Sequence, residues 1–317
     1  MLLRTLLHER YAVLKSLSER SVEVYAITLL WFDRYLATRE GRATGPGTLD
    51  DLDDLVVAGF LRWRATQVVR GRRVSPATVA KDRVQLLSLW TFAARKRMKT
   101  SAGDVIEFPS LPQAKTVHRV PVAYTLDEVR GMIAIARTRT GHTGPVPSSW
   151  WWSTILGAAF VTGERIGALR QLRWGQVDLA RRRIVFLAET RKGGRADAVR
   201  SITPALAREL AAHAGPPDEL VWPWPRKPLS IYASLKKIAL RAGVKPRGFH
   251  AIRKSSASYV AAAGGDASAH LGHGDPSIAR DHYLDPRIVQ EPAGLDFLPR
   301  LDDGEEAEFV PDPEEAA

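Results

Sequence analysis

Six residues in the second half of the chain have types and spacings suited to one kind of chemistry. They are Arg165, Lys192, His250, Arg253, His273 and Tyr283, in the segments TGERIGAL, TRKGGR, GFHAIRKSS, HLGHGD and ARDHYLDP. Five are cationic or can become so, and the sixth carries a phenol. The planar fork of an arginine donates two hydrogen bonds to two phosphate oxygens and stays charged. The set therefore predicts a pocket that grips a phosphodiester while a phenol oxygen attacks it.

The spacing of these residues assigns them separate tasks. His250 precedes Arg253 by three residues, so on a helix both side chains lie on one face. Arg165 and Arg253 would hold the two non-bridging oxygens, where charge builds in the transition state. A phenol has a pKa near 10, so a cationic pocket that favours the phenolate would activate Tyr283. One such arginine taken alone is more often a surface or salt-bridged residue, and only the whole set favours catalysis.

The five segments, in this order, resemble the tyrosine recombinase (phage integrase) family over roughly residues 10–290. The resemblance implies that Tyr283 is the nucleophile, that Lys192 protonates the departing 5′ oxygen, and that His250 and His273 bond the phosphate. Arg191 and Arg195, beside Lys192, are secondary phosphate contacts.

A 3′-phosphotyrosyl intermediate conserves the bond energy, so neither ATP, a metal nor another cofactor is expected. The resemblance further implies a homo-tetramer on two double-stranded DNA sites that exchanges strands through a Holliday junction. Accessory DNA-bending or directionality proteins are expected as further partners, and the phosphotyrosyl link is a covalent protein–DNA intermediate.

One position departs from the family pattern. The family usually has Glu or Asp three residues after its first arginine, where this chain has Ala168. Glu164, beside Arg165, is the nearest carboxylate that could substitute. Two alternatives stay open: a catalytically silent DNA-binding relative, and a nicking-closing enzyme like the type IB topoisomerases.

Charge independently favours a polyanionic partner. The net charge is +11, and it rises to +19 when the last seventeen residues, eight of them acidic, are set aside. The chain has no cysteine, which excludes a disulfide framework and a thiolate nucleophile. Its longest apolar stretch, 150–161, is too short to span a bilayer. We therefore expect a cytoplasmic, nucleoid-associated protein without a membrane segment.

The first half of the chain reads as a helical domain that would position DNA. Ser18 or Ser21 would cap a helix whose apolar residues continue to Leu36, and residues 49–70 form a second helical region. Ser75 would cap a third helix that ends in the basic run 95–99. This half resembles the family's core-binding (SAM-like) domain, and we assign residues 1–103 to it.

The second half reads as helices around a small antiparallel sheet. Thr125 and Glu128 have capping-box spacing, and residues 150–163 read as a buried helix. Strands are predicted at 182–188 and 198–202, around a turn that carries Lys192. We expect a mostly α fold with an α+β catalytic domain at 124–300. Residues 104–123, with three prolines, are assigned to a linker and 301–317 to an acidic tail expected to be disordered.

Overall fold

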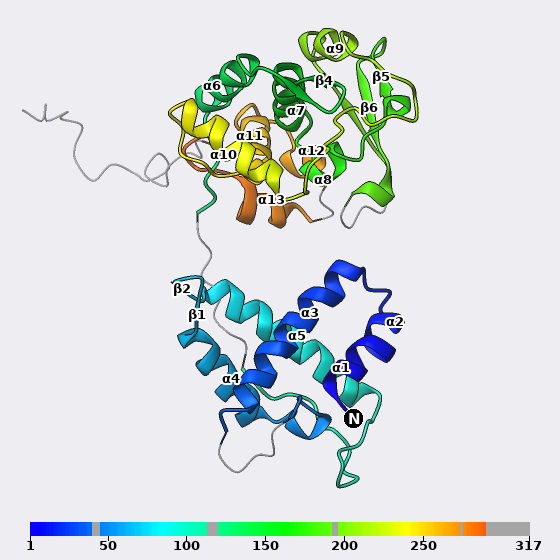
Figure 1. Cartoon of the computed structure of the whole chain (residues 1–317), viewed down its shortest axis with the longest axis vertical. Coiled ribbons are helices and arrows are strands. Elements are labelled where there is room, and N and C mark those ends of the chain that lie inside the picture. Colours follow the sequence, from blue (N-terminus) through cyan, green and yellow to red (C-terminus); the bar gives the residue numbers. More distant parts are fainter. Residues whose placement is uncertain (40–44, 113–119, 192–195, 273–274, 290–317) are drawn as a thin grey trace, which may run out of the picture. The chain divides into compact units, whose positions relative to one another are not determined.

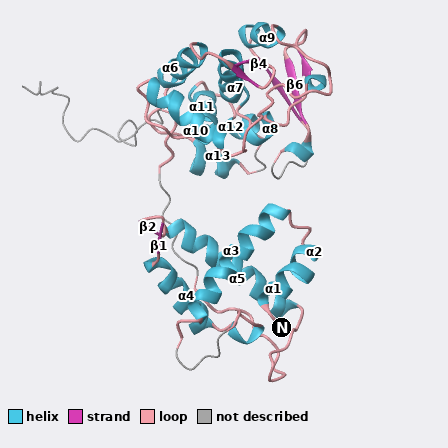
Figure 2. Cartoon of the chain, in the orientation of Figure 1, coloured by secondary structure: helices cyan, strands magenta, loops and turns pink. Residues whose placement is uncertain are grey.

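The computed structural model describes residues 1–39, 45–112, 120–191, 196–272 and 275–289. The chain divides into two compact units, Met1–Val117 and His118–Ala317. Each unit consists mainly of helices, and the strands are short and antiparallel (Figures 1 and 2). The predicted mostly α fold with a small antiparallel sheet is thus confirmed. The acidic tail at 301–317 lies outside the described residues.

The first unit is built from helices, and its three long ones begin at polar caps. Its elements are α1 (Leu3–Thr5), a π-helical segment (Leu6–Tyr11), α2 (Ala12–Leu14), α3 (Glu19–Leu36), a 3-10 turn (Leu49–Asp51), α4 (Asp54–Thr66), β1 (Val68–Val69), β2 (Arg72–Arg73) and α5 (Pro76–Arg95). Ser18 accepts a hydrogen bond from the Ser21 N–H, and Ser75 accepts one from the Thr78 N–H. Of the two cap candidates Ser18 and Ser21, Ser18 is therefore the cap of α3, and the cap predicted at Ser75 is confirmed.

A buried polar network joins the three long helices of this unit. The Asp82 carboxylate on α5 is fully buried and lies 2.9 Å from Arg64 Nε on α4. It also accepts a hydrogen bond of 2.7 Å from Thr28 Oγ1 on α3. Since a buried carboxylate is tolerated only with such partners, the network fixes how α3, α4 and α5 pack.

The prediction that residues 49–70 form one helical region was wrong at its C-terminal end. The region begins with a 3-10 turn, and α4 starts only after the Asp53 cap. Helix α4 ends at Thr66. A hairpin of β1 and β2 follows, in which Val68 pairs with Arg73. Arg70 and Gly71 both have positive φ, 51° and 73°, which is the backbone that a tight two-residue hairpin turn requires.

The second unit surrounds one central helix with shorter elements. They are α6 (Leu126–Arg137), β3 (His142–Thr143), β4 (Val146–Pro147), α7 (Ser148–Thr162), α8 (Ile166–Leu169), a 3-10 turn (Trp174–Gln176), β5 (Val177–Asp178), β6 (Arg183–Phe186), a 3-10 turn (Ala188–Thr190), β7 (Ala198–Ser201), α9 (Pro204–Ala211), α10 (Ser230–Arg241), α11 (Phe249–Ala262), α12 (Ala267–Leu271) and α13 (Pro276–Tyr283). The capping box of Thr125 and Glu128 opens α6 as predicted. Strands β5, β6 and β7 form an antiparallel sheet in that order, in which Ile184 pairs with Arg200.

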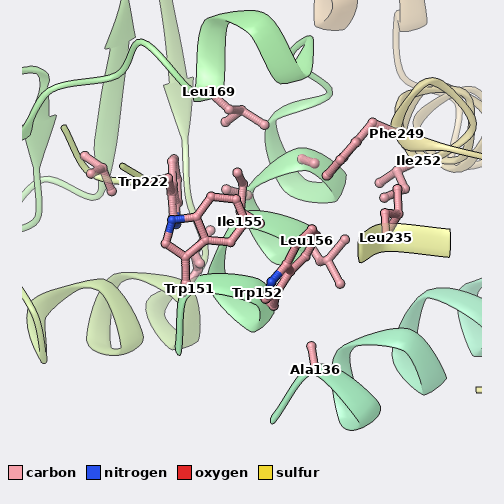
Figure 3. Close-up of a cluster of buried hydrophobic side chains, with 14 of the residues drawn as sticks. Ala136, Trp151, Trp152, Ile155, Leu156, Leu169, Trp222, Leu235, Phe249 and Ile252 are labelled. Carbon is pink, nitrogen blue, oxygen red and sulfur yellow. The ribbon is translucent and has the colours of Figure 1, made fainter. Parts of the chain in front are cut away.

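Helix α7 is buried on nearly every side, as its apolar sequence predicts. Trp151 and Trp152 have no exposed surface, and their rings pack against each other at a centroid distance of 4.8 Å. Leu235 of α10 and Ile252 of α11 belong to the same cluster (Figure 3). The C-terminal end of α7 is therefore held rigidly, and it supports the residues that directly follow Thr162 in the sequence.

The segment assigned to a linker, residues 104–123, packs into the first unit at its N-terminal end and into the second unit at its C-terminal end. Ile106 is buried in the core of the first unit, and the Glu107 carbonyl accepts a hydrogen bond from Trp90 Nε1. At the other end, Ala123 and Tyr124 are fully buried in the second unit. Among the described residues, no helix is both long and apolar enough to cross a lipid bilayer.

Candidate active site

A pocket of about 650 Å³ opens between α8, α11 and the turn before β7 in the second unit. Arg165, His250 and Arg253 all line it, although α8, the sheet, α9 and α10 separate Arg165 from the other two in the sequence. The fold thus brings together three of the six predicted residues. Figure 1 shows α11 near the middle of this unit, with α8, α12 and α13 close to it in that view, and α11 packs against α12 and α13.

Arg165 is placed by the turn that ends α7. Gly163 has φ of 62° and terminates the helix, and Arg165 then occupies the N-cap position of α8. A Cβ at Gly163 would lie only 2.7 Å from His270 Nε2, so this close approach requires glycine. Arg165 lines the pocket, and within the described residues no salt bridge involves it.

Arg253 lies at the bottom of the pocket and is 1% exposed. Its guanidinium donates hydrogen bonds to the carbonyls of Gly163 and Leu271, the second at 3.0 Å. It thereby ties the turn before Arg165 to the end of α12. Burial and the charge of Arg165 lower the pKa of Arg253 to about 10, so it stays protonated at neutral pH.

His250 lies one helical turn before Arg253 on α11, as their spacing predicts. Partial burial of the ring lowers the pKa of His250 below its usual 6.5, and three neighbouring cations add to the shift. They are Lys254, Arg253 and Arg165. The imidazole is therefore neutral at pH 7 and is able to accept a proton.

Tyr283, the last residue of α13, lies beside these two side chains. Its ring meets the His250 ring edge-on at a centroid distance of 5.1 Å, and the Arg253 guanidinium lies 5.4 Å above its centroid. Tyr259 on α11 has its hydroxyl occupied by the Leu126 N–H at 2.7 Å, and its ring packs on Phe160. The geometry favours Tyr283 over Tyr259 as the phenol that faces the cations.

Asp285 holds the chain that follows Tyr283. Its carboxylate is fully buried, accepts the Ala123 N–H at 2.7 Å and lies 2.6 Å from Arg287 Nη2. Although burial acts to raise the pKa of Asp285, the hydrogen bonds from Arg287 and Ala123 lower it to about 2. We call this set of contacts the Asp285 clasp.

We expect Asp285→Asn to destabilise the second unit at pH 7. The depressed pKa stabilises the folded state above the ordinary value of 3.8, and that stabilisation is lost as pH falls through 3.8 toward 2. Because Arg287 is half exposed, we discount the full shift and expect a loss of about 1 to 2 kcal/mol at pH 7. Urea unfolding at several pH values checks this: the gap between the two proteins should close below pH 4, and a gap independent of pH would contradict the assignment.

Two of the six predicted residues, Lys192 and His273, lie outside the described residues, as does Arg195. Their chain neighbours Arg191 and Gly272 are described and lie against each other. A Cβ at Gly272 would be 2.5 Å from Arg191 Nη2.

Arg191, predicted as a secondary phosphate contact, lines the pocket and pairs with the buried carboxylate of Glu164 at 3.1 Å, and its side chain is 8% exposed. Arg200 on β7 pairs with the same carboxylate at 3.3 Å. Sequence reasoning did not single out Arg200, because nothing in its neighbourhood on β7 signals a contact with residue 164. Ala168, at the usual acidic position, packs in the hydrophobic core and is 2% exposed. Among the described residues, no three His, Asp or Glu side chains gather as a metal-binding group.

Comparison with known proteins places this arrangement in a family. The model of the phage integrase family matches residues 124–288, which is more than half of the chain. No curated protein sequence matches.

Among solved structures, the XerH site-specific recombinase bound to palindromic difH substrate in a post-cleavage complex aligns with a TM-score of 0.66. The two are 18% identical over 87% of this chain and 79% of that one. The Tn1549 transposon integrase in complex with transposon right end DNA aligns with a TM-score of 0.61. Its identity is 12%, over 94% of this chain and 97% of that one. At these identities the alignments establish a shared fold.

Proposed function

The chain belongs to the phage integrase family, and from this premise we propose that it is a site-specific DNA recombinase acting through a tyrosine nucleophile. The observation that carries the proposal is the contact of Tyr283 with both His250 and Arg253, beside a pocket that Arg165 also lines. Such a pocket suits a phosphodiester, whose negative charge would meet fixed cations in the transition state.

The proposed reaction exchanges one phosphoester for another. The Tyr283 oxygen attacks phosphorus while its proton passes to neutral His250. The bond from phosphorus to the 5′ oxygen breaks, and that oxygen takes a proton from Lys192. The products are a 3′-phosphotyrosyl link and a free 5′ hydroxyl, and attack by another 5′ hydroxyl reverses the steps. Arg165 and Arg253 would bind the non-bridging oxygens, with His273 as a further donor.

The first unit would bind the DNA that flanks the cleavage site. Its basic run at 95–99 is exposed at Arg95, Lys96, Arg97 and Lys99. A groove of about 400 Å³ between the π-helical segment and α5 is lined by Lys15, Arg83 and Arg95. Cations that track a phosphate backbone give affinity without sequence readout, so we assign this unit to positioning.

We further propose that four copies act on two double-stranded sites and exchange strands through a Holliday junction. Accessory DNA-bending or directionality proteins would set the outcome. These statements rest on family membership.

A covalent-trapping assay tests the proposal. Purified protein is mixed, without metal or ATP, with nicked duplexes drawn from the DNA flanking its own gene, and the products are run on a denaturing gel. We expect a shifted protein–DNA band whose DNA carries a blocked 3′ end and whose other fragment has a 5′ hydroxyl. DNA binding without such a band would instead favour a silent relative, and sequence-independent relaxation of supercoiled plasmid would favour a topoisomerase-like enzyme.

A further inference from the structure

A smaller pocket of the second unit lies between α6 and α10, two helices that pack against each other (Figure 1). Its volume is about 250 Å³, and it is lined by Thr138, Arg139, Thr140, Lys237 and Arg241. The first three directly follow α6, and the last two lie on the second half of α10. None of the five lines the proposed catalytic pocket, which holds Arg165, His250 and Arg253. We call this second site the α6–α10 pocket.

The α6–α10 pocket gathers positive charge without a matching acid. Within the described ranges of the chain, no salt bridge joins Arg139, Lys237 or Arg241 to a carboxylate. Burial lowers the pKa of Arg139, and the charges of Arg241 and Arg226 lower it further. Like charges around one pocket repel each other, so an anion between them would stabilise the arrangement.

Arg139 is held in place while its fork of donors stays available. Its side chain is half-buried, and the guanidinium carbon lies 5.7 Å from the centre of the Trp152 ring. The Nε atom is buried without a hydrogen-bond partner among the described residues. Neither Nη atom is buried in this way, and no hydrogen bond ties them to the part of the chain that the structure describes. A guanidinium fixed by packing, with two donors available, is preorganised for an anion with paired oxygens.

The attraction of cations to helix C-termini is not enough to explain this pocket. It accounts for an exposed arginine such as Arg137, which ends α6 and pairs with Glu209. It does not favour placing Lys237 and Arg241 around the same pocket as Arg139, because their mutual repulsion opposes that placement.

We propose that the α6–α10 pocket binds a phosphate group, at a site separate from the proposed catalytic pocket. Arginine forks and lysine ammonium groups are the side chains that proteins use to bind phosphate oxygens. The volume of about 250 Å³ is below the roughly 300 to 1,000 Å³ of pockets that enclose a whole small molecule. A single phosphate or pyrophosphate group therefore suits the pocket better than a nucleotide does.

Two sources carry this chemistry: a free anion and the backbone of bound DNA. Tyr232 on α10 lines the proposed catalytic pocket, and Lys237 follows it by five residues, which is about 7.5 Å along a helix. DNA held at the catalytic pocket is therefore within reach of the α6–α10 pocket.

Thermal unfolding in the presence of inorganic pyrophosphate, at constant ionic strength, tests the pocket. The variant is Lys237→Gln/Arg241→Gln, in which both changed residues are exposed, so it is expected to fold. Pyrophosphate at about 100 times its Kd should raise the unfolding midpoint of the wild-type protein by roughly 5 °C. The double variant should lose most of that rise. Arg165→Gln, which changes the catalytic pocket, should keep the part that the double variant loses.

The matched control is Lys236→Gln/Arg130→Gln. It removes two positive charges from the same two helices at exposed residues that do not line the pocket. Arg130 pairs with Asp127 on the surface, where such a pair contributes little to stability. The control should respond to pyrophosphate like the wild-type protein.

The salt dependence of DNA binding identifies the source of the phosphate. The Kd for a duplex from the DNA flanking the gene is measured at several KCl concentrations. The slope of log Kd against log salt concentration falls by about 0.9 for each phosphate contact that is lost. A smaller slope in Lys237→Gln/Arg241→Gln than in the control assigns the phosphate to the DNA backbone. An unchanged slope with a lost pyrophosphate effect assigns it to a free anion.

Equal pyrophosphate effects together with equal salt slopes in the double variant and its control would overturn the inference. Neither measurement requires cleavage of DNA. Failure of the proposed reaction is therefore distinguishable from failure of this inference, because a protein that forms no covalent adduct is still able to bind phosphate at the α6–α10 pocket.

Discussion

Replacing Tyr283 with phenylalanine is expected to abolish the covalent protein–DNA adduct while leaving DNA binding intact. The substitution removes only the hydroxyl, so the edge-on contact with His250 and the position beneath Arg253 are kept. Loss of a catalytic nucleophile lowers rates by roughly 10³-fold or more. The measurement is adduct yield on a denaturing gel beside an electrophoretic binding assay.

Tyr259→Phe is the matched control. It deletes the hydroxyl that accepts a hydrogen bond from the Leu126 N–H, which costs about 1 kcal/mol of stability. Its adduct yield should equal that of wild type. An adduct in Tyr283→Phe, or its selective loss in Tyr259→Phe, would show that the nucleophile has been misassigned.

Replacing Arg253 is expected to have the second-largest effect. Arg253→Ala removes a buried cation from the bottom of the pocket, and we expect cleavage to fall by roughly 10³-fold, as when a transition-state donor is lost. Because the carbonyls of Gly163 and Leu271 lose their donor as well, this variant is also expected to be less stable.

Arg253→Lys distinguishes the loss of cleavage from the loss of stability. It keeps a positive charge but not the planar fork, so cleavage should still fall by roughly 10²-fold in a folded protein. Arg137→Lys, on the surface beside Glu209, controls for the general effect of an arginine-to-lysine substitution. Single-turnover cleavage and thermal melting measure the two effects separately. Wild-type cleavage by Arg253→Lys would remove this residue from phosphate recognition.

The features that the sequence predicted best are local. The caps at Ser18 and Ser75 and the capping box at Thr125 depend on residues at most three positions apart, and each forms as expected. The hairpin at 68–73 was missed because Arg70, rather than the usual Asn or Asp, takes the first positive φ of its turn.

In the candidate site, too, the sequence predicted local features but not contacts between distant positions. The spacing of His250 and Arg253 places both on one face of α11, which needs only the geometry of a helix. The pairing of Glu164 with Arg191 and Arg200 joins positions 27 and 36 residues apart, and no local pattern encodes it. It depends on how the sheet packs beside the end of α7, so only the folded chain reveals that Arg191 points inward.

The Asp285 clasp has a mechanical consequence. Ser258 Oγ on α11 donates to the Tyr283 carbonyl at 3.2 Å and accepts the Asp285 N–H at 2.9 Å, while Asp285 grips the Ala123 N–H. A DNA end attached to Tyr283 would pull on α13. The force would be transmitted through Ser258 to α11 and through Asp285 to the backbone at Ala123. Tyr283, the proposed nucleophile, is thus linked to Ala123 near the start of its own unit, so a force applied at either residue would be transmitted to the other.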